Sequence, residues 1–230
     1  MHPVYVHIKK ELSPFYAEEE ASAMAKWISS DILHLSTLEL YTGKDMNFST
    51  KEWAELEDIL RRLKQREPLQ YILQKASFCG RSFHVEQGVL IPRPETEELV
   101  EWIVSDYRKA GQVRILDIGT GSGCIPVSLA QLLPEAQVSS CDVSTEALRI
   151  AAMNVKRYGG KVTLFCADIL KEELPECQVD VLVSNPPYIT ESERTDMEAN
   201  VLDWEPELAL FVPDSDPLRF YRRIARKGLD

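Results

Sequence analysis

The chain has 230 residues, of which 44% are hydrophobic, and this is enough for the core of one large domain or of two small ones. The formal net charge is -11 at pH 7. Because nucleic-acid binding over a whole surface depends on lysine and arginine that neutralise phosphates, this charge argues against such a protein and leaves room only for a local basic patch. Met1–Lys10 has no apolar stretch for secretion or membrane insertion, so we expect a cytoplasmic protein that does not bind membranes.

The first 75 residues predict a helical domain. Ser13-Pro14 has the form of an N-cap followed by proline at the first helical position, and it predicts the start of a helix. A second helix is expected to end at Gly43. Ser49 and Glu52 form a capping box for a third helix, whose apolar residues recur at helical spacing. Such stripes are typical of a helix-bundle core rather than of a ligand pocket.

Residues 76–92 predict a β-hairpin that links two domains, because aromatic and β-branched residues flank Gly80. Pro94 then begins a new helix with glutamates in its first turn, where acidic side chains favour the helix dipole. We place the second domain at residues 93–230.

From residue 113 onward, short apolar runs alternate with helical stretches, which is typical of an α/β protein with a parallel sheet covered by helices. Ligands of such open sheets bind beyond the carboxyl ends of the strands. The residues that follow each strand are therefore the candidates for a site. The expected strands are residues 113–118, 137–141, 161–166 and 179–184, and the expected helices are residues 125–133, 145–158 and 217–227.

A glycine-rich turn follows the first strand. Its glycines permit a tight turn and the close approach of a ligand at a helix N-terminus, although a loop that merely needs glycine remains the alternative. The spacing is Gly-x-Gly-x-Gly, because Cys124 and Pro126 stand where a dinucleotide fingerprint would have its last glycine. This counts against a nicotinamide dehydrogenase and resembles the first motif of Rossmann-like methyltransferases, which curls around the methionine part of S-adenosylmethionine. The turn reads Asp117-Ile118-Gly119-Thr120-Gly121-Ser122-Gly123.

Acidic residues follow the second and third strands. Asp142 could accept hydrogen bonds from two ribose hydroxyls, a role that nicotinamide and adenosyl cofactors share. Asp168 could accept from an adenine amino group, and Ile169 offers an apolar surface for the ring. Asp117 is a candidate partner for the ammonium group of the cofactor. Each aspartate alone could equally be a solvated loop residue or a helix cap, but a shared sheet edge favours a nucleoside site.

Asn185-Pro186-Pro187-Tyr188 follows the fourth strand and is the most specific motif in the chain. The prolines could simply end the strand in a turn. The alternative is chemical: an amide or arylamine nitrogen is a poor nucleophile until both of its N–H groups are held. The Asn185 side-chain oxygen and the Pro186 carbonyl could accept these two N–H groups, while Tyr188 packs on the flat group. Catalysis would then consist mainly of positioning, without a dedicated strong base.

Several stretches resemble the HemK/PrmC-type protein-(glutamine-N5) methyltransferases, which act on peptide chain release factors. Within the matching stretch Val89–Glu97, residues Ile91–Glu97 are specific to that family, whereas the motif at Asn185 is shared with adenine and guanine amino methyltransferases. The other matching stretches are Glu67–Ile72, Phe78–Phe83, the glycine turn and Trp204–Pro206.

The resemblance implies a Rossmann-like α/β fold, S-adenosylmethionine as cofactor, and the glutamine of the Gly-Gly-Gln loop of class 1 release factors as substrate. The helical domain would help to bind the release factor, and we expect a monomer without stable nucleic-acid binding. The implied catalytic residues are Asn185, Pro186 and Tyr188, and Asn185 through Tyr188 bind the substrate. The implied cofactor residues are Asp117, Gly119, Thr120, Gly121, Ser122, Gly123, Asp142, Asp168, Ile169 and Asn185.

Fewer strands are expected here than the fold of that family has. We therefore expect a truncated second domain in which the strand before Asn185 is an unpaired edge, and a chain that is poorly active as given. Two other functions stay open: an N6-adenine or N2-guanine methyltransferase of nucleic acids, and a non-catalytic protein-binding adaptor. The acidic composition and Ile91–Glu97 count against the first, and the intact motif at Asn185 counts against the second. The cysteine and histidine spacings indicate no metal site.

Overall fold

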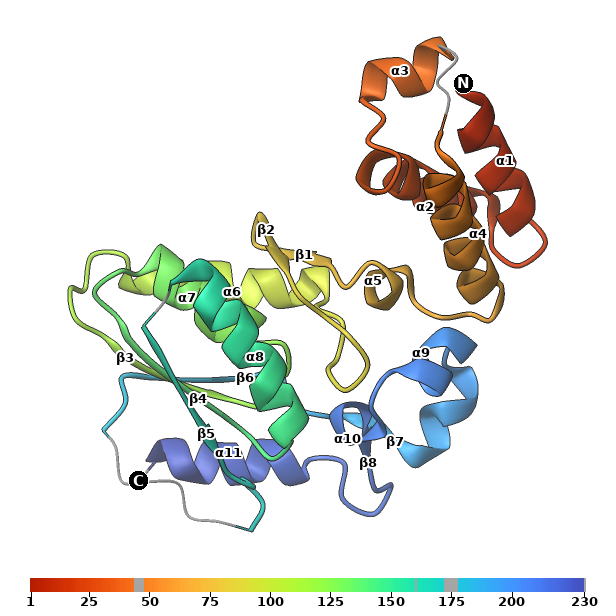
Figure 1. Cartoon of the computed structure of the whole chain (residues 1–230). Helices are drawn as coiled ribbons and strands as arrows, with labels where there is room; N and C mark the ends of the chain where they lie inside the picture. Colours follow the sequence, from red (N-terminus) through yellow and green to blue (C-terminus); the bar gives the residue numbers. More distant parts are fainter. Residues whose placement is uncertain (44–47, 160, 172–177, 230) are drawn as a thin grey trace. The chain divides into compact units, whose positions relative to one another are not determined.

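The computed structural model describes residues 1–43, 48–159, 161–171 and 178–229 and divides into two compact units, Met1–Ile72 and Leu73–Asp230. The first unit is helical (Figure 1). Its helices are α1 (Pro3–Leu12), α2 (Glu18–Asp31), α3 (Thr37–Thr42), α4 (Thr50–Lys64) and α5 (Leu69–Ile72).

The helix start expected at Ser13-Pro14 was predicted wrongly. Ser13-Pro14 does not begin a helix but follows the end of α1, and Ser13 donates from both its backbone N–H and its Oγ to the carbonyl of Lys9. The helix expected after this pair is α2, which begins at Glu18. The preceding helix α1 was not predicted; it begins at Pro3, where the ring of His2 accepts the N–H of Val4. A serine hydroxyl can bond to the carbonyl four residues earlier as well as cap a following helix, so the residue pair alone could not decide between the two.

The helix ends near residues 43 and 49 follow local rules. Gly43 ends α3 in a left-handed conformation with φ +68°. The predicted capping box of α4 is present, because Ser49 accepts from the N–H of Glu52 and the Glu52 carboxylate accepts from the N–H of Ser49. The apolar face of α4 is buried in the first unit.

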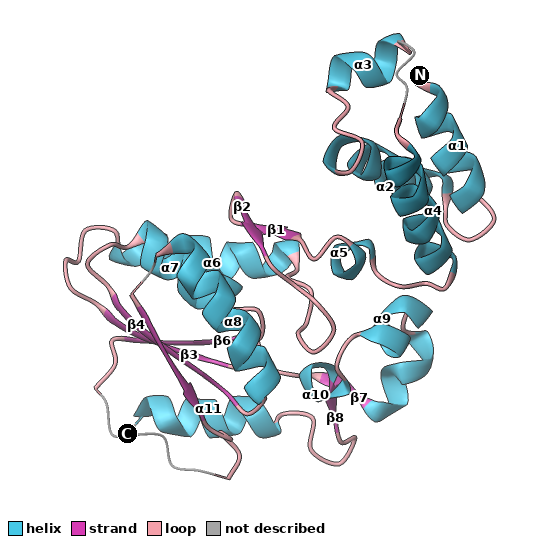
Figure 2. Cartoon of the chain, viewed as in Figure 1, coloured by secondary structure: helices cyan, strands magenta, loops and turns pink. Residues whose placement is uncertain are grey.

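The second unit contains a parallel sheet (Figure 2), whose four strands have the order β5-β4-β3-β6. Its strands are β3 (Arg114–Ile118), β4 (Gln137–Asp142), β5 (Val162–Cys166) and β6 (Val181–Ser184). The covering helices are α6 (Pro94–Tyr107), α7 (Cys124–Leu132), α8 (Thr145–Tyr158) and α11 (Arg219–Leu229). The Rossmann-like α/β class is confirmed, and in the described residues β6 lies at one edge of this sheet.

Alternate side chains of β3 fill two different cores. Ile115 packs with α6, α7 and the hairpin formed by β1 (Ala76–Phe78) and β2 (Arg81–Phe83). Leu116 and Ile118 face the other side, where Phe220 and Ile224 of α11 pack. Because successive strand residues point to opposite faces, an apolar strand of this kind must be covered on both sides. Figure 1 shows α11 on the opposite face from α6, α7 and α8.

The chain beyond the Asn185 motif contains elements that the sequence pattern did not predict. β7 (Ile189–Thr190) pairs in parallel with β8 (Phe211–Val212). Between them lie the 3-10 helix η1 (Glu191–Asp196) and the short helices α9 (Ala199–Trp204) and α10 (Glu207–Leu210). Elements this short carry too few residues for a periodic signal.

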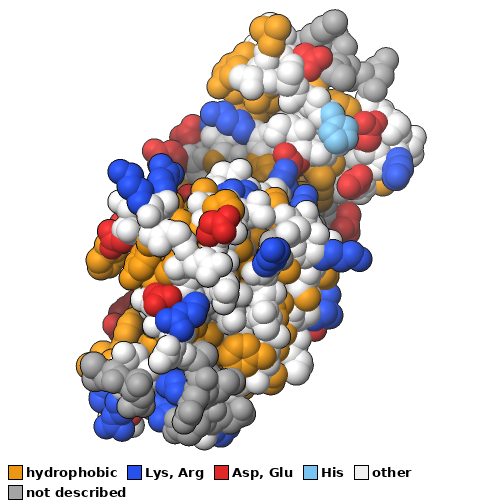
Figure 3. Space-filling view, turned by 90° about the vertical axis from the view of Figure 1, so that its left-hand side faces the viewer, with side chains coloured by type: hydrophobic (Ala, Val, Ile, Leu, Met, Phe, Trp, Pro, Cys, Tyr) orange, Lys and Arg blue, Asp and Glu red, His pale blue; other side chains and the backbone are white. Residues whose placement is uncertain are grey.

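Charged side chains of both signs are mixed on the face shown in Figure 3. None of the helices in the described ranges is long and apolar enough to cross a membrane. The described cysteines are free thiols, and Cys177 lies outside the described residues.

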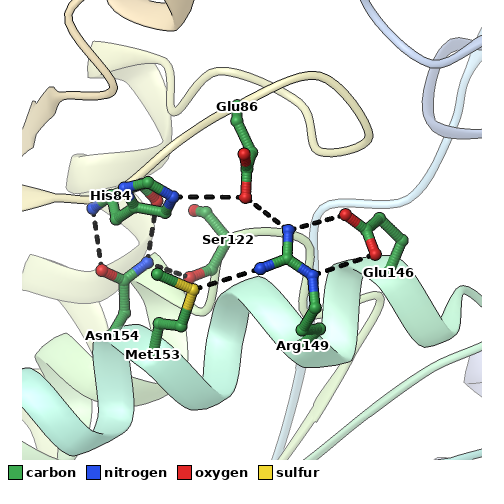
Figure 4. Close-up of polar contacts among 7 residues, drawn as sticks. All are labelled: His84, Glu86, Ser122, Glu146, Arg149, Met153 and Asn154. Atoms are coloured by element: carbon green, nitrogen blue, oxygen red, sulfur yellow. Dashed lines mark hydrogen bonds and ion pairs between the residues drawn. The ribbon is translucent and has the colours of Figure 1, made fainter.

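A buried amide joins the hairpin, the glycine turn and α8 (Figure 4). The Asn154 Oδ1 accepts the N–H of His84 at 2.8 Å, and its Nδ2 donates to the carbonyls of His84 and Ser122 at 2.9 and 2.8 Å. Asn154 is fully buried, so these contacts satisfy its acceptor and both of its donors without water. Beside it, Arg149 bonds both Glu86 and Glu146 and adds an exposed link between the same segments.

Asn154→Leu should lower the free energy of unfolding by about 2–4 kcal/mol, because it leaves three backbone groups without their partner. Urea denaturation followed by circular dichroism measures this change. Lys156→Leu, an exposed substitution on the same helix, is the matched control and should change the stability little. A loss below about 1 kcal/mol in Asn154→Leu would show that the amide is not the main link.

Candidate active site

The carboxyl ends of three neighbouring strands bring the predicted site residues to one edge of the sheet. Ile118 at the end of β3 is paired with Cys141 on one side and with Ser184 on the other. The Ser184 hydroxyl donates to the carbonyl of Ile118 at 2.6 Å, which ties the two strand ends together. The glycine turn, Asp142 and Asn185 therefore leave the sheet side by side.

The glycine turn has the conformation that a ligand-binding turn requires. Gly119 and Thr120 both donate their N–H groups to the carbonyl of Cys141, at 2.8 and 3.0 Å, which bends the chain sharply after β3. Gly119 and Gly121 have φ values of +81° and +52°, and a Cβ on either would meet open space. The glycines are thus needed for their backbone angles, and the space beside them is free for a ligand. Gly123 differs, because a Cβ there would meet Ala151 of α8.

Asp142 supports the turn from the end of β4. Its two carboxylate oxygens accept the N–H groups of Gly121 and Ser144, each at 2.9 Å. Burial raises the pKa of this carboxyl, and the backbone N–H groups oppose that change. A carboxylate oxygen has more than one lone pair, so the predicted bonds to a ribose are compatible with these contacts, and that role stays a prediction.

Asp117 is completely buried at the end of β3. One carboxylate oxygen accepts the hydroxyl of Ser140 at 2.6 Å, and Oδ1 has no hydrogen-bond partner among the residues described. Burial raises the pKa of Asp117 from 3.8 to about 7. A buried acid with an unpaired oxygen beside an open turn fits a ligand that brings a positive charge to this place.

The structure places Asp168 and Ile169 in different surroundings. The Asp168 carboxylate accepts from the N–H of Leu170 and forms an ion pair with Lys171, both at 3.0 Å. Ile169 is buried in the core beneath the sheet, together with Leu116. Their predicted contacts with an adenine ring stay predictions.

A pocket of about 230 Å³ lies beside the Asn185 motif. Asn185 is half-buried, Pro186 is buried, and Tyr188 is 58% exposed. The motif therefore presents polar acceptors and an aromatic ring to a space that can hold a small planar group. The pocket is lined by Leu90, Arg93, Asn185, Pro186, Tyr188, Ile189, Met197, Val201, Ala209 and Leu210.

Three side chains that contact the pocket or its lining residues were assigned no role from the sequence: Arg93, Thr96 and Glu205. Asn185 donates its Nδ2 to the hydroxyl oxygen of Thr96 at 3.2 Å. The Glu205 carboxylate accepts the N–H of Ile91 at 3.1 Å and pairs with the guanidinium of Arg93 at 2.5 Å. The resemblance singled out Ile91–Glu97 and Trp204–Pro206, and this was the only signal that could have pointed to these contacts.

Comparison with known proteins gives two matching family models. The PrmC N-terminal domain matches residues 5–73, and the methyltransferase small domain matches residues 96–203. Among the described residues, no group of three or more histidine, cysteine or acidic side chains is arranged to bind a metal ion.

The curated relatives match almost the whole chain. A release factor glutamine methyltransferase of Bacteroides thetaiotaomicron is 51% identical over 229 residues, which cover 99% of this chain and 82% of the relative. That of Flavobacterium psychrophilum is 41% identical and covers 93% and 76% of the two chains. The crystal structure of the hMettl16 catalytic domain with the MAT2A 3'UTR hairpin 6 has a TM-score of 0.51 at 18% identity, covers 82% of this chain and 66% of that one, and supports the fold alone. The chain belongs to the release factor glutamine methyltransferase family, whose members are S-adenosylmethionine-dependent methyltransferases.

Proposed function

We propose that this protein transfers a methyl group from S-adenosylmethionine to the side-chain nitrogen of the glutamine in the Gly-Gly-Gln motif of class 1 peptide chain release factors. The observation that carries the proposal is the position of the Asn185 motif, which lines a pocket and leaves the end of β6 next to the end of β3, where the glycine turn begins. Family membership supports it, because the relatives are named for this substrate.

The substrate amide is flat and has two N–H groups but a weakly nucleophilic nitrogen. Asn185 Oδ1 and the carbonyl of Pro186 accept one N–H group each and thereby hold the nitrogen in one orientation. Tyr188 packs against the face of the amide, and the rigid backbone of Pro186 and Pro187 keeps the acceptors fixed. Holding two reacting groups in this way can lower the activation barrier by roughly 7–11 kcal/mol.

The turn residues fit the cofactor. Gly119 and Gly121 leave open space, Asp142 would accept from its ribose, and the buried carboxylate of Asp117 would pair with its ammonium group. Bound S-adenosylmethionine supplies an electrophilic methyl group on a positively charged sulfur. The residues that we assign to it are Asp117, Gly119, Thr120, Gly121, Ser122, Gly123, Asp142, Asp168, Ile169 and Asn185.

A strong base is not part of this proposal. Methylation makes the amide nitrogen far more acidic, so its proton can leave to water or to one of the acceptors that already hold it, the Asn185 oxygen or the Pro186 carbonyl. The protein contributes orientation and acceptors instead of proton abstraction.

We also propose that the helical unit at residues 1–75 contributes to binding of the release factor. In the same proposal, residues 76–92 link it to the methyltransferase domain at residues 93–230, and the enzyme acts as a cytoplasmic monomer without stable nucleic-acid binding. The -11 charge supports the absence of stable nucleic-acid binding, and the relatives' names support the release factor as the partner.

Methyl transfer from tritiated S-adenosylmethionine should label a class 1 release factor, and should not label the same factor with the loop glutamine replaced by alanine. DNA and ribosomal RNA offered in parallel should stay unlabelled. Labelling of nucleic acid alone would favour a base amino methyltransferase. Absence of cofactor binding by calorimetry would favour a non-catalytic adaptor.

Asn185→Ala should lower kcat/KM for the release factor by about 100-fold or more, because it removes one of the two acceptors that orient the amide. Single-turnover kinetics and a thermal melt separate this loss from unfolding. Lys161→Ala, an exposed change near the opposite edge of the sheet, should leave kcat/KM unaltered. Turnover at the wild-type rate in Asn185→Ala would remove the basis of the proposed mechanism.

Binding of S-adenosylmethionine should strengthen about tenfold between about pH 6 and about pH 8, because Asp117 must ionise to pair with the ammonium group. Its pKa of about 7 in the free protein sets this window. Calorimetry in buffers of different ionisation enthalpy should also detect a proton released on binding at the lower pH. Asp117→Asn should bind S-adenosylmethionine more weakly at high pH. It should also lose the pH dependence of binding and the release of a proton.

The same raised pKa has a consequence for stability without cofactor. In the folded state Asp117 keeps its proton up to about pH 7, whereas in the unfolded chain, where its pKa is near 3.8, it loses this proton at a lower pH. The contribution of this group to the free energy of unfolding is therefore fully present below about pH 4 and is lost as the pH rises through about 7. If the free energy of unfolding depends on pH in the same way in wild type and Asp117→Asn, the raised pKa of Asp117 is contradicted.

A further inference from the structure

We propose that Thr96 is a positioning residue of the methyl-transfer site, which holds the Asn185 amide with its oxygen directed at the substrate, and that Glu205 fixes the segment that carries Thr96. This inference rests on the proposed function for its kinetic part. Neither Thr96 nor Glu205 would touch the substrate, but both would determine how Asn185 contacts it.

The end of an asparagine side chain has one acceptor and two donors of nearly the same shape. If Asn185 were turned by 180°, its NH2 group would face the NH2 group of the substrate, and two donors would meet. The 3.2 Å bond from Asn185 Nδ2 to Thr96 Oγ1 occupies the donor end. Asn185 Oδ1 is then the end that can accept an N–H group in the pocket.

The position of Thr96 follows from the start of α6. Arg93 precedes the helix in an extended conformation, Pro94 occupies its first position, and the N–H of Thr96 donates to the carbonyl of Arg93 at 3.0 Å. Proline fixes the backbone at the entry to the helix, and a β-branched side chain has few rotamers. The Thr96 hydroxyl is therefore restricted to few positions relative to the first turn of α6.

Glu205 anchors the chain immediately before this turn. Its side chain is only 2% exposed, and its carboxylate bonds both the N–H of Ile91 and the guanidinium of Arg93. A buried carboxylate is stable only when it is paired and hydrogen-bonded, so these contacts fix the segment strongly. Glu205 follows α9, and Val201 of α9 and Arg93 both line the pocket. The ion pair thus joins two walls of the pocket. It also fixes the place where α6, the helix that carries Thr96, begins.

The kinetic test compares Thr96→Val, which keeps the shape but removes the hydroxyl, with Thr96→Ser, which keeps the hydroxyl. Thr96→Val should lower kcat for the release factor by about tenfold and leave the Kd for S-adenosylmethionine within about twofold, since the loss concerns one orienting hydrogen bond. Thr96→Ser should retain most of the activity. Thr163→Val makes the same chemical change at an exposed position of β5, the opposite edge of the sheet, and should have wild-type kinetics.

A double-mutant cycle tests whether Glu205 acts through Thr96. Glu205→Gln should lower kcat by about three- to tenfold, and the variant with both Glu205→Gln and Thr96→Val should lose less than the product of the two single effects. A double variant that shows the full product would separate Glu205 from the proposed role. Thermal melts of all variants identify losses that come from unfolding.

A second measurement needs no substrate. The side-chain NH2 signals of Asn185 in a ¹⁵N spectrum, assigned with Asn185→Asp, should exchange with water more slowly in wild type and Thr96→Ser than in Thr96→Val. If the wild-type enzyme methylates no release factor, the proposed function fails, and this exchange measurement still decides the role of Thr96. Equal exchange in all three proteins, or full kcat in Thr96→Val, would overturn the inference.

Discussion

Parallel pairing of β3 with both β4 and β6 is the constraint on which the site depends. Because the strands run in the same direction, their carboxyl ends lie at one edge, and the segments that follow them emerge together. The glycine turn, Asp142 and Asn185 come from three separate stretches of sequence and meet for this reason alone. A slip of one residue in β6 would turn its side chains to the opposite faces of the sheet and change how the chain leaves it toward Asn185.

Contacts between distant segments then hold this edge in shape. Asn154 of α8 bonds the carbonyl of Ser122 within the glycine turn and the backbone of His84 after the hairpin. At the other end of the same connecting segment, Glu205 bonds Ile91 and Arg93. The chain between the hairpin and α6 is therefore fixed at both ends, once to the cofactor side and once to the substrate side of the proposed site.

The electrostatics of the site divide between its two halves. On the proposed cofactor side, Asp117 and Asp142 are acids whose pKa values are raised by burial, which suits a ligand that arrives with a positive charge. On the substrate side, the groups that line the pocket from the Asn185 motif are a neutral amide, a proline backbone and an aromatic ring. A neutral amide substrate needs fixed acceptors more than it needs charge, and the bond from Asn185 to Thr96 fits this need in the proposed site.

The sequence by itself determined the features that are encoded locally: the four strands, the capping box at Ser49, Pro94 at the start of α6, and the motifs at the strand ends. These depend on residues a few positions apart, so periodicity and spacing reveal them. The error at Ser13-Pro14 was of the same local kind, because one residue pair suits either side of a helix boundary. Only the tertiary structure decided the pairings of Thr96 with Asn185, of Glu205 with Ile91, and of Asn154 with His84. The residues in these pairs are 89, 114 and 70 positions apart in the sequence. No local pattern predicts which distant backbone or side-chain group a buried polar group will contact, because that partner is set only when the sheet forms.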